Sequence, residues 1–292
     1  MQIKEQELLS KYTTWRIGGP ARIMYQPENQ TELIQLLREL HEHEQEFYIL
    51  GGGSNLLAAD QGTELAVINT SSNLVNLKIE DCIIRAEAGV PLPLLAYRAA
   101  EAGLSGLEFA SGIPGTVGGA IVMNAGAYGG QMADVVEKVI CSDRTGELLV
   151  LTPEECAFAY RQSRFKQDRN LIIIEVVFHL RQGVTEEIKA VMQERQVERK
   201  TKQPLEYPNA GSVFKNPVGH SAGLLIEAAG AKGWRIGDAA VSEKHANFIV
   251  NLGQARQEDV VELVKKVKET VKMQFEIELE EEFIYFPVKN QK

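Results

Sequence analysis

The order of apolar and polar residues along the chain predicts both helices and strands. Apolar residues three or four positions apart predict helices over residues 31–44, 91–102 and 258–275. Apolar runs bounded by turn residues predict strands over 21–26, 47–50, 66–69, 74–79, 82–88, 135–141, 148–151, 171–180 and 277–286. Two short helices are expected over 153–159 and 221–229.

A change in composition divides the chain. Residues 185–202 are mostly charged and predict a long helix that links two domains, and a length of 292 residues fits about two domains. We therefore expect a first domain over residues 1–185, in two lobes of about 1–75 and 76–185, and a second domain over residues 186–292.

The segment from Gly106 to Gly130 is the densest in glycine, with eight glycines in 25 residues. Glycine at this density disfavours a regular helix or strand, and the segment is too apolar for a solvated linker. Its backbone N–H groups need other partners, and a bound pyrophosphate is an anion that bare backbone can approach closely. The alternative is a buried glycine-rich connection without a ligand.

A second glycine-rich segment, Gly51 to Asn55, follows the expected strand over 47–50. It is similar to a dinucleotide-binding fingerprint, but Leu56 stands where the third glycine belongs and no helical pattern follows. The sequence contains no Gly-Lys dipeptide, which excludes a P-loop. A loop between strands is thus the expected phosphate-binding element.

Composition and charge narrow the class of protein. With 44% apolar and 24% charged residues the chain is typical of soluble globular proteins, and its net charge of −9 argues against nucleic acid or acidic membranes as partners. No run of about 18 apolar residues occurs and the first residues lack a signal-peptide core, so we expect a cytoplasmic protein, monomeric by default. The spacing of the three cysteines and five histidines predicts neither disulfides nor a metal site.

Six motifs occur in this order along the chain: TTWRIGGPA, ILGGGSNLL, SGIPGTVGGAIVMNAGAYGG, YRQSRFK, QP followed by NAGSVFKNP, and VSEKHANFIVN. Together they resemble the UDP-N-acetylenolpyruvoylglucosamine reductase (MurB) family of flavin enzymes in peptidoglycan precursor synthesis. The compact link over residues 161–180 resembles the shorter, second type of this enzyme. The resemblance covers nearly the whole chain.

The resemblance implies a fold and a reaction. The fold is α+β: an FAD-binding domain of the vanillyl-alcohol-oxidase (PCMH) type in two lobes, followed by a C-terminal α+β substrate-binding domain. In the reaction, hydride passes from NADPH to FAD and then to the methylene carbon of an enolpyruvyl ether, and a proton is added at the neighbouring carbon. The implied product is UDP-N-acetylmuramate, with roles in cell-wall biogenesis, cell shape and cell division.

Hydride addition to such an ether pushes charge into its carboxylate, so the site needs a fixed cation and a placed proton donor. By the resemblance, Arg161 is the matching arginine, and its guanidinium can bind a carboxylate through two hydrogen bonds. The alternative for Arg161 is a surface ion pair. Ser212 matches the proton donor and follows two small residues; its alternative is a loop-capping hydroxyl.

The family's C-terminal strand carries a Leu-Glu-Pro-Glu-Val-like pattern whose second glutamate is catalytic. Here Glu281 replaces the proline, and alignment on Leu279 selects Glu282 as the catalytic residue. Three glutamates in a row leave a slip of this register open. Alternation along a strand puts Glu280 and Glu282 on one face and Glu281 on the other, so we expect Glu281 to be the solvated one.

The resemblance also implies binding residues. The expected FAD contacts are Arg16, Gly51, Gly52, Gly53, Ser54, Asn55, Gly112, Ile113, Pro114, Gly118, Gly119, Asn124, Gly126 and Tyr128. The expected contacts to the UDP-sugar are Lys215, Asn216, His245 and Asn247. For His245 the alternative is a plain core or surface histidine.

Two other functions compete with this interpretation. An oxidase or dehydrogenase of alcohols or lactones on the same scaffold would keep the flavin domain, but NAGSVFKNP and HANFIVN argue against it. A nucleotide-binding regulatory or structural protein without catalysis would need neither Arg161 nor Ser212 nor a C-terminal glutamate. A flavin absorbance spectrum separates both enzymes from this third possibility.

Overall fold

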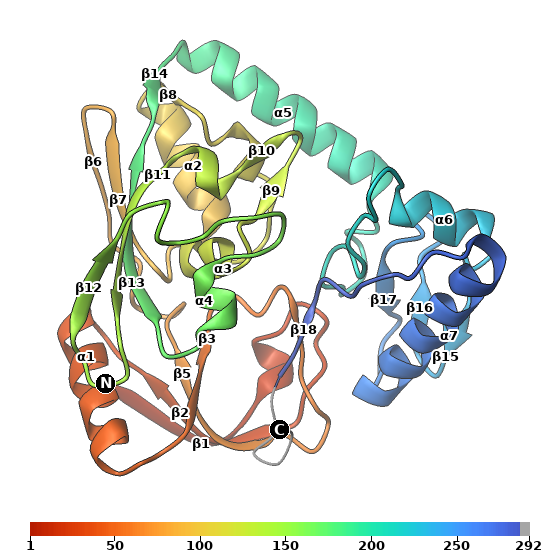
Figure 1. Cartoon of the computed structure of the whole chain (residues 1–292), viewed down its shortest axis with the longest axis horizontal. Coiled ribbons are helices and arrows are strands. Elements are labelled where there is room, and N and C mark those ends of the chain that lie inside the picture. The colour runs from red at the N-terminus through yellow and green to blue at the C-terminus, as the bar shows by residue number, and fades with distance from the viewer. Residues whose placement is uncertain (287–292) are drawn as a thin grey trace. The chain divides into compact units, whose positions relative to one another are not determined.

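The computed structural model describes residues 1–286, which form two compact units (Figure 1). The first unit comprises Met1–Glu5, Ile23–Gly52 and Leu65–Glu198. The second comprises Gln6–Arg22, Gly53–Glu64 and the chain from Arg199 onward. The predicted domain boundary after residue 185 stays a prediction; the compact units divide at residue 198 and place two N-terminal segments in the second unit.

The first unit is built on a five-stranded antiparallel sheet in the order β12-β11-β13-β7-β6 (Figure 1). Its larger core lies between this sheet and the helices α2 and α3, because α3 contacts both β7 and β13. The bounds are β6 (Leu77–Glu80), β7 (Ile83–Glu87), α2 (Leu92–Glu101), α3 (Val117–Val122), β11 (Val136–Ser142), β12 (Leu148–Leu151) and β13 (Ile172–His179).

A smaller core in the first unit joins α1 (Gln30–Glu42) to the parallel pair β3 (Phe47–Leu50) and β5 (Thr63–Asn69). The helix begins at Asn29, whose side chain accepts a hydrogen bond from the N–H of Glu32, and its leucines face this core. The strand order of the sheet is β1-β2-β5-β3, with β1 at Gln2–Leu8 and β2 at Pro20–Gln26.

Short elements complete the first unit and lead into the second. They are β8 (Leu104–Ser105), β9 (Gly126–Ala127), β10 (Gly130–Gln131), α4 (Arg164–Gln167), β14 (Arg181–Gln182) and the long helix α5 (Thr185–Lys202). Single turns of 3-10 helix lie at Glu108–Ala110 and Met132–Asp134 in the first unit and at Leu9–Lys11 in the second. The predicted helix over 185–202 is confirmed at both ends.

The second unit packs α7 against a three-stranded antiparallel sheet in the order β15-β16-β17, and α6 packs against α7. Five valines and leucines of α7 form the buried side of that helix, as its sequence period predicts. The bounds are β4 (Leu56–Leu57), α6 (Ala222–Ala228), β15 (Arg235–Ile236), β16 (Ala239–Val241), β17 (Ile249–Asn251), α7 (Gln257–Phe275) and β18 (Ile284–Tyr285), and β18 pairs parallel with β4.

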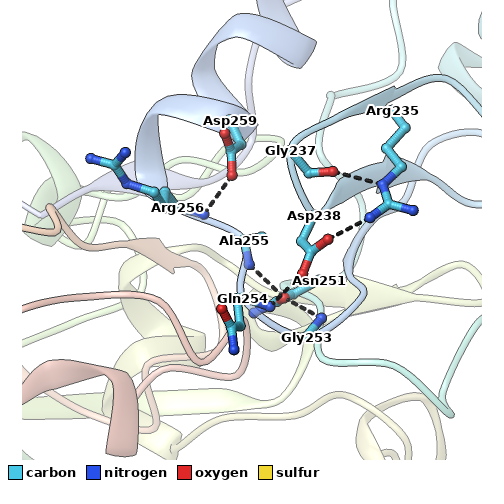
Figure 2. A network of polar contacts seen from close by, with 9 residues as sticks. All are labelled: Arg235, Gly237, Asp238, Asn251, Gly253, Gln254, Ala255, Arg256 and Asp259. Carbon is cyan, nitrogen blue, oxygen red and sulfur yellow. Dashed lines mark hydrogen bonds and ion pairs between the residues drawn. The ribbon is translucent and has the colours of Figure 1, made fainter.

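A network of polar contacts fixes the turn between β17 and α7 (Figure 2). The side-chain oxygen of Asn251 accepts hydrogen bonds from the N–H groups of Gly253 and Ala255 at 2.8 and 2.9 Å. The carboxylate of Asp238 accepts from the N–H of Gln254 at 2.9 Å and pairs with Arg235. The start of the longest helix in the second unit is therefore held to the β15–β17 sheet.

Trp15 ties the N-terminal segment into this core. Its ring is fully buried, its Nε1–H donates to the carbonyl of Ile249 at 2.8 Å, and its carbonyl accepts from the amide of Asn251 at 2.9 Å. The ring also meets Phe283 edge-to-face, with centroids 5.3 Å apart. This is the physical reason that residues 6–22 belong to the second unit.

Two predicted elements are wrong. Residues 153–159 form turns and no helix, because the chain turns at Ala157, whose φ is +48°. The predicted strand over 277–286 is a strand only at Ile284–Tyr285, with one isolated bridge between Glu281 and Phe214. No single strand pairs with this segment along its whole length.

Among the described residues, no helix is long and apolar enough to span a membrane.

Candidate active site

The first unit brings the two glycine-rich segments together. A Cβ atom on Gly51 would lie 2.6 Å from the hydroxyl oxygen of Thr116, and one on Gly52 would lie 2.8 Å from the Cα of Gly115. Neither position has room for a side chain, so the two loops can meet only through glycine. Backbone from both predicted flavin motifs therefore lines the same part of the unit.

An unused hydrogen-bond donor lies beside these loops. The side chain of Asn69 is fully buried, and within residues 1–286 its Nδ2 has no hydrogen-bond partner. Asn69 pairs in register with Leu50, the residue before the Gly51 loop, at the carboxyl ends of two parallel strands. Ligands of α/β proteins bind at such strand ends, so the unused donor and the bare loop fit the polar groups of a dinucleotide cofactor.

The short helix α3 continues the central motif. Thr116 begins it by accepting a hydrogen bond from the N–H of Gly119 at 3.4 Å, while Gly118 packs on Ala88. Gly119 itself is exposed. The predicted contacts before α3 lie in the turn that leads to it, where Gly112 and Ile113 are half-buried and Pro114 is exposed.

Asn124 serves the protein's own backbone. Its amide nitrogen donates to Gln131 and to the carbonyl of Ala159, both at 3.0 Å, and its oxygen accepts from the N–H of Ala133. All three bonds hold the end of the glycine-rich segment. As an FAD contact Asn124 stays a prediction, and its side-chain hydrogen-bonding groups are already occupied within the protein.

Tyr128 is similarly engaged by helix α5. Its hydroxyl donates to the carbonyl of Arg195 at 3.2 Å, and the Arg195 guanidinium lies 5.2 Å from its ring centroid. The backbone of Tyr128 has a φ of +54°, a conformation that few non-glycine residues adopt. Its role as an FAD contact stays a prediction.

Arg161 belongs to the first unit and lies beside the glycine-rich segment. Its guanidinium donates to the carbonyl of Gly126 at 2.9 Å and lies 5.0 Å from the ring centroid of Tyr160. Its own carbonyl accepts from the ammonium of Lys166, and its φ is +56°. A half-buried arginine held in a strained backbone conformation is oriented, and a guanidinium is a fork of N–H donors suited to an anion.

Four predicted FAD contacts, Arg16, Gly53, Ser54 and Asn55, fall in segments of the second unit. Gly53 has a φ of +58°, and a Cβ there would lie 1.8 Å from the carbonyl oxygen of Tyr12. Its carbonyl accepts from the N–H of Thr14 at 3.2 Å. Ser54 is half-buried, and Arg16 is exposed with a φ of +57°.

The Ser212 loop lies against the glutamate segment in the second unit. The N–H of Glu282 donates to the carbonyl of Val213 at 2.8 Å, and the N–H of Lys215 donates to the carbonyl of Glu280 at 2.9 Å. The amide of Asn55 donates to the carbonyl of Glu282 at 3.0 Å. Among the three glutamates, Glu282 is thus the one paired with the residue next to Ser212.

The prediction that Glu281 is solvated is wrong. Its carboxylate pairs with Lys268 of α7 at 2.7 Å, and its side chain is less exposed than that of Glu280, at 22% against 71%. The reason is that Leu279 and Phe283 both face the core, so the residue between them lies on the core side. Burial, together with the nearby Glu281 carboxylate, raises the pKa of Tyr285 to about 12.

The predicted substrate residues differ in their surroundings. The buried ammonium of Lys215 pairs with Glu280, and the side chain of Asn216 accepts from the N–H of Ala222 at the start of α6. The ring of His245 is half-buried, and its Nδ1 accepts from the N–H of Asn247 at 3.2 Å. Burial lowers the pKa of His245.

Asn247 is the residue whose surroundings fit its predicted role least. It is buried, and its side chain makes two hydrogen bonds to the backbone of Phe214. The sequence interpretation also missed Asn209, whose oxygen accepts from the N–H of Gly211 at 2.9 Å and shapes the turn before Ser212. An asparagine two residues before a glycine is a turn signal that the sequence offered.

Comparison with known proteins agrees with this arrangement. Residues 203–286 match the C-terminal domain model of UDP-N-acetylenolpyruvoylglucosamine reductase, and residues 21–152 match an FAD binding domain model. A UDP-N-acetylenolpyruvoylglucosamine reductase of Symbiobacterium thermophilum is 46% identical over 281 residues, covering 96% of this chain and 91% of the relative. The corresponding protein of Caldanaerobacter subterraneus is 47% identical over 273 residues, covering 94% and 90%.

The chain belongs to the UDP-N-acetylenolpyruvoylglucosamine reductase family. The crystal structure of the reductase (MurB) from Thermus caldophilus, 41% identical, matches with a TM-score of 0.83 over 98% of this chain and all of that one. The predicted family, and an α+β fold with an FAD-binding region followed by the C-terminal domain of the reductase family, are therefore confirmed.

Proposed function

We propose that this protein reduces UDP-N-acetylglucosamine enolpyruvate to UDP-N-acetylmuramate, using FAD and NADPH, in the synthesis of peptidoglycan precursors. The observation that carries the proposal is the pairing of Glu282 with Val213, which brings the two motifs of the proposed protonation site together. It occurs in a chain that shares 46% identity with a reductase of this name over nearly its full length.

FAD, when bound, supplies a carrier that takes hydride from NADPH and gives it to the substrate. The backbone of Gly51 and Gly52, together with the turn before α3, is the part of the first unit that would hold it. The unused Nδ2 donor of Asn69 supports this assignment. A Cβ on Gly51 or Gly52 would meet Thr116 or Gly115, so the backbone of this loop stays bare, as close approach to an anion requires.

Arg161 binds the substrate carboxylate in the proposed reaction. Hydride addition makes that group enolate-like, so a fixed guanidinium stabilises it more in the transition state than in the ground state. The hydrogen bond from Arg161 to Gly126 orients the fork before substrate arrives. Such preorganisation lowers the cost of ordering the side chain during the reaction.

Ser212 delivers the proton to the carbon next to the new C–H bond. A serine hydroxyl is a poor acid in water, so its proximity and the surrounding charges must favour the transfer. The half-buried Ser212 follows Gly211, whose φ is +76°, in a turn that Asn209 shapes. Glu282, held at both its N–H and its carbonyl, supplies the second polar group of this protonation site.

The finer assignments follow from the same proposal. Lys215, Asn216 and His245 contact the diphosphate or sugar of the substrate, and NADPH is the hydride donor. The protein acts in the cytoplasm as a monomer, and its product serves cell-wall growth, cell shape and cell division.

The test begins with the flavin and then turns to the substrate. The purified protein is expected to show a flavin absorbance spectrum, to consume NADPH when the enolpyruvyl UDP-sugar is added, and to be inactive on alcohols with oxygen. Turnover of alcohols would instead favour an oxidase on the same scaffold. The absence of a flavin spectrum, even after FAD is added, would leave only a nucleotide-binding protein without this catalysis.

A further inference from the structure

Asn247 binds the chain just after Ser212 through three hydrogen bonds. The N–H of Val213 donates to the backbone carbonyl of Asn247 at 2.8 Å. The N–H of Phe214 donates to the side-chain oxygen of Asn247, and the side-chain amide donates to the carbonyl of Phe214, both at 2.9 Å. The Asn247 side chain therefore occupies the place that a neighbouring strand would take.

The other edge of the same short segment is also paired. Glu282 donates to the carbonyl of Val213, and the N–H of Lys215 donates to the carbonyl of Glu280. Residues 213–215 are thus held from two sides although they belong to no regular sheet. Because Ser212 directly precedes this clamp, the clamp sets where its Cα lies.

Only an amide side chain of the length of asparagine pairs with both the backbone N–H and the backbone carbonyl of Phe214. Asn247 is 4% exposed and Phe214 is 2% exposed, so water cannot replace either hydrogen bond. Aspartate would keep the acceptor for the Phe214 N–H, but its second oxygen would face the Phe214 carbonyl. A protonated aspartate could donate there and restore the pair.

We propose that Asn247 is a positioning residue for Ser212, acting through the backbone of Val213 and Phe214 and not through contact with the substrate. The inference rests on the proposed function, in which Ser212 delivers a proton. A displacement of about 1 Å in a reacting group can cost about 100-fold in rate, so loss of the clamp slows protonation even in a folded protein.

The test uses the full-length enzyme with FAD and measures two half-reactions separately. Flavin reduction by NADPH is followed first, and flavin reoxidation by saturating enolpyruvyl UDP-sugar is followed second. Asn247→Asp is expected to reduce flavin at the wild-type rate and to reoxidise it about 100-fold more slowly at pH 8. The deficit relative to wild type is expected to shrink as the pH falls to 6, because protonated aspartate restores the donor.

Other titratable and charged groups near Asn247 can also change the rate with pH, so each variant is compared with the wild type at the same pH. His245, Lys215 and Glu280 pack around the same segment, so each variant rate is divided by the wild-type rate at that pH. Asn251→Asp is the matched control: Asn251 is also a buried asparagine bonded to backbone, but at Trp15, Gly253 and Ala255. It is expected to lower the melting temperature without a selective, pH-dependent loss of reoxidation.

Each outcome either supports or overturns the positioning role of Asn247. A wild-type reoxidation rate for Asn247→Asp across the pH range, or a raised KM with unchanged kcat, overturns the positioning role. If this variant does not fold at pH 8, Asn247→Ser is measured, and it is expected to slow reoxidation alone; equal slowing of both half-reactions overturns the proposal. Ser212→Ala is run in parallel, because a wild-type reoxidation rate there refutes the proton-donor role of Ser212 on which this inference rests, whereas a wild-type enzyme that the substrate does not reoxidise refutes the proposed function itself.

Discussion

The N–H of Glu282 donates a hydrogen bond of 2.8 Å to the carbonyl of Val213. This bond joins the end of the chain to the residue after Ser212, and the amide of Asn55 holds the other side of the same peptide. Side chains on segments paired in this way move together. The proposed proton donor and the proposed glutamate therefore depend on one shared piece of backbone, and separate substitutions test each of them.

Substitution of Ser212 by alanine is expected to separate the two half-reactions. Flavin reduction by NADPH should proceed at the wild-type rate, because a proton donor for the substrate has no part in it. Turnover of the enolpyruvyl substrate should be nearly abolished. Stopped-flow absorbance of the flavin measures both steps.

A second serine in the same unit provides the control for that experiment. Ser221 caps helix α6 by accepting a hydrogen bond from the N–H of Leu224. Ser221→Ala should lower stability by about 1 kcal/mol and leave both half-reactions intact. Equal loss of both half-reactions in Ser212→Ala would show that Ser212 is structural.

The three consecutive glutamates should respond very differently to change into glutamine. Glu282→Gln is expected to lower kcat by about 10²- to 10⁴-fold, the usual range for an acid–base group. Glu281→Gln loses the partly exposed ion pair with Lys268 and should cost less than about 1 kcal/mol of stability, with little change in rate. Glu280→Gln removes the partner of Lys215 and should alter substrate binding more than rate.

Steady-state kinetics and urea unfolding of the three variants check that ranking. An essential Glu280 beside a dispensable Glu282 would mean that the register chosen from Leu279 is wrong by two residues. A large rate loss in Glu281→Gln would instead point to a role for the Lys268 pair in the reaction.

His245 should make the protein less stable in acid. Burial lowers the pKa of His245 below its ordinary value, so the unfolded chain binds a proton at a higher pH than the folded protein does. Stability is therefore full above about pH 6.5 and falls as the pH drops through that value towards the lower folded pKa. Protonation also removes the acceptor at Nδ1 that the N–H of Asn247 uses.

Melting temperatures between pH 7.5 and pH 5 check this in wild type and in His245→Gln. The variant should lose less stability over that range, whatever its stability at pH 7.5. The control is the same substitution, His43→Gln, at an exposed histidine at the end of α1. Parallel curves for wild type and His245→Gln would contradict the prediction.

Trp15→Phe should destabilise the second unit. The substitution keeps the six-membered ring but removes the hydrogen bond to the carbonyl of Ile249, a residue that is 2% exposed. Loss of a buried hydrogen bond and of part of a buried ring together should cost about 1–3 kcal/mol. Urea unfolding monitored by circular dichroism measures the change.

The same substitution at the other tryptophan is the control. Trp234 is only partly buried and lies under the ammonium of Lys266, 4.3 Å from the ring centroid. Phenylalanine can retain much of that contact, so Trp234→Phe should cost less than Trp15→Phe. The reverse order would mean that the Trp15 hydrogen bond contributes little.

Elements whose stability depends on their own residues could be predicted from the sequence. Helix α5 has the predicted bounds, and α1 is shorter by two residues at its end because the backbone of Glu44 turns to a φ of +50°. The segment over 277–286 could not be predicted in this way. Its conformation depends on two separate neighbours, Phe214 and β4, that lie far away in the sequence.

The candidate site shows the same division. The motifs predicted the glycines, Ser212 and the three consecutive glutamates as site residues, because a sequence shows residue types and their order. Which residue touches which was not visible: the packing of Gly52 on Gly115 and the clamp of Asn247 on Phe214 both join distant segments. Asn247 was accordingly predicted to contact the substrate, whereas its side chain binds the backbone of its own chain.

The burial of Trp15 in the second unit has a consequence for synthesis on the ribosome. Its partners Ile249, Asn251 and Phe283 are translated after more than 230 further residues, since Trp15 and Ile249 are 234 positions apart. At a synthesis rate of about 5–20 residues per second, Trp15 has none of these core partners for roughly 10–50 s after it is added to the chain. During that interval the Trp15 side chain is available to chaperones, and a chain truncated before Ile249 lacks every one of these partners.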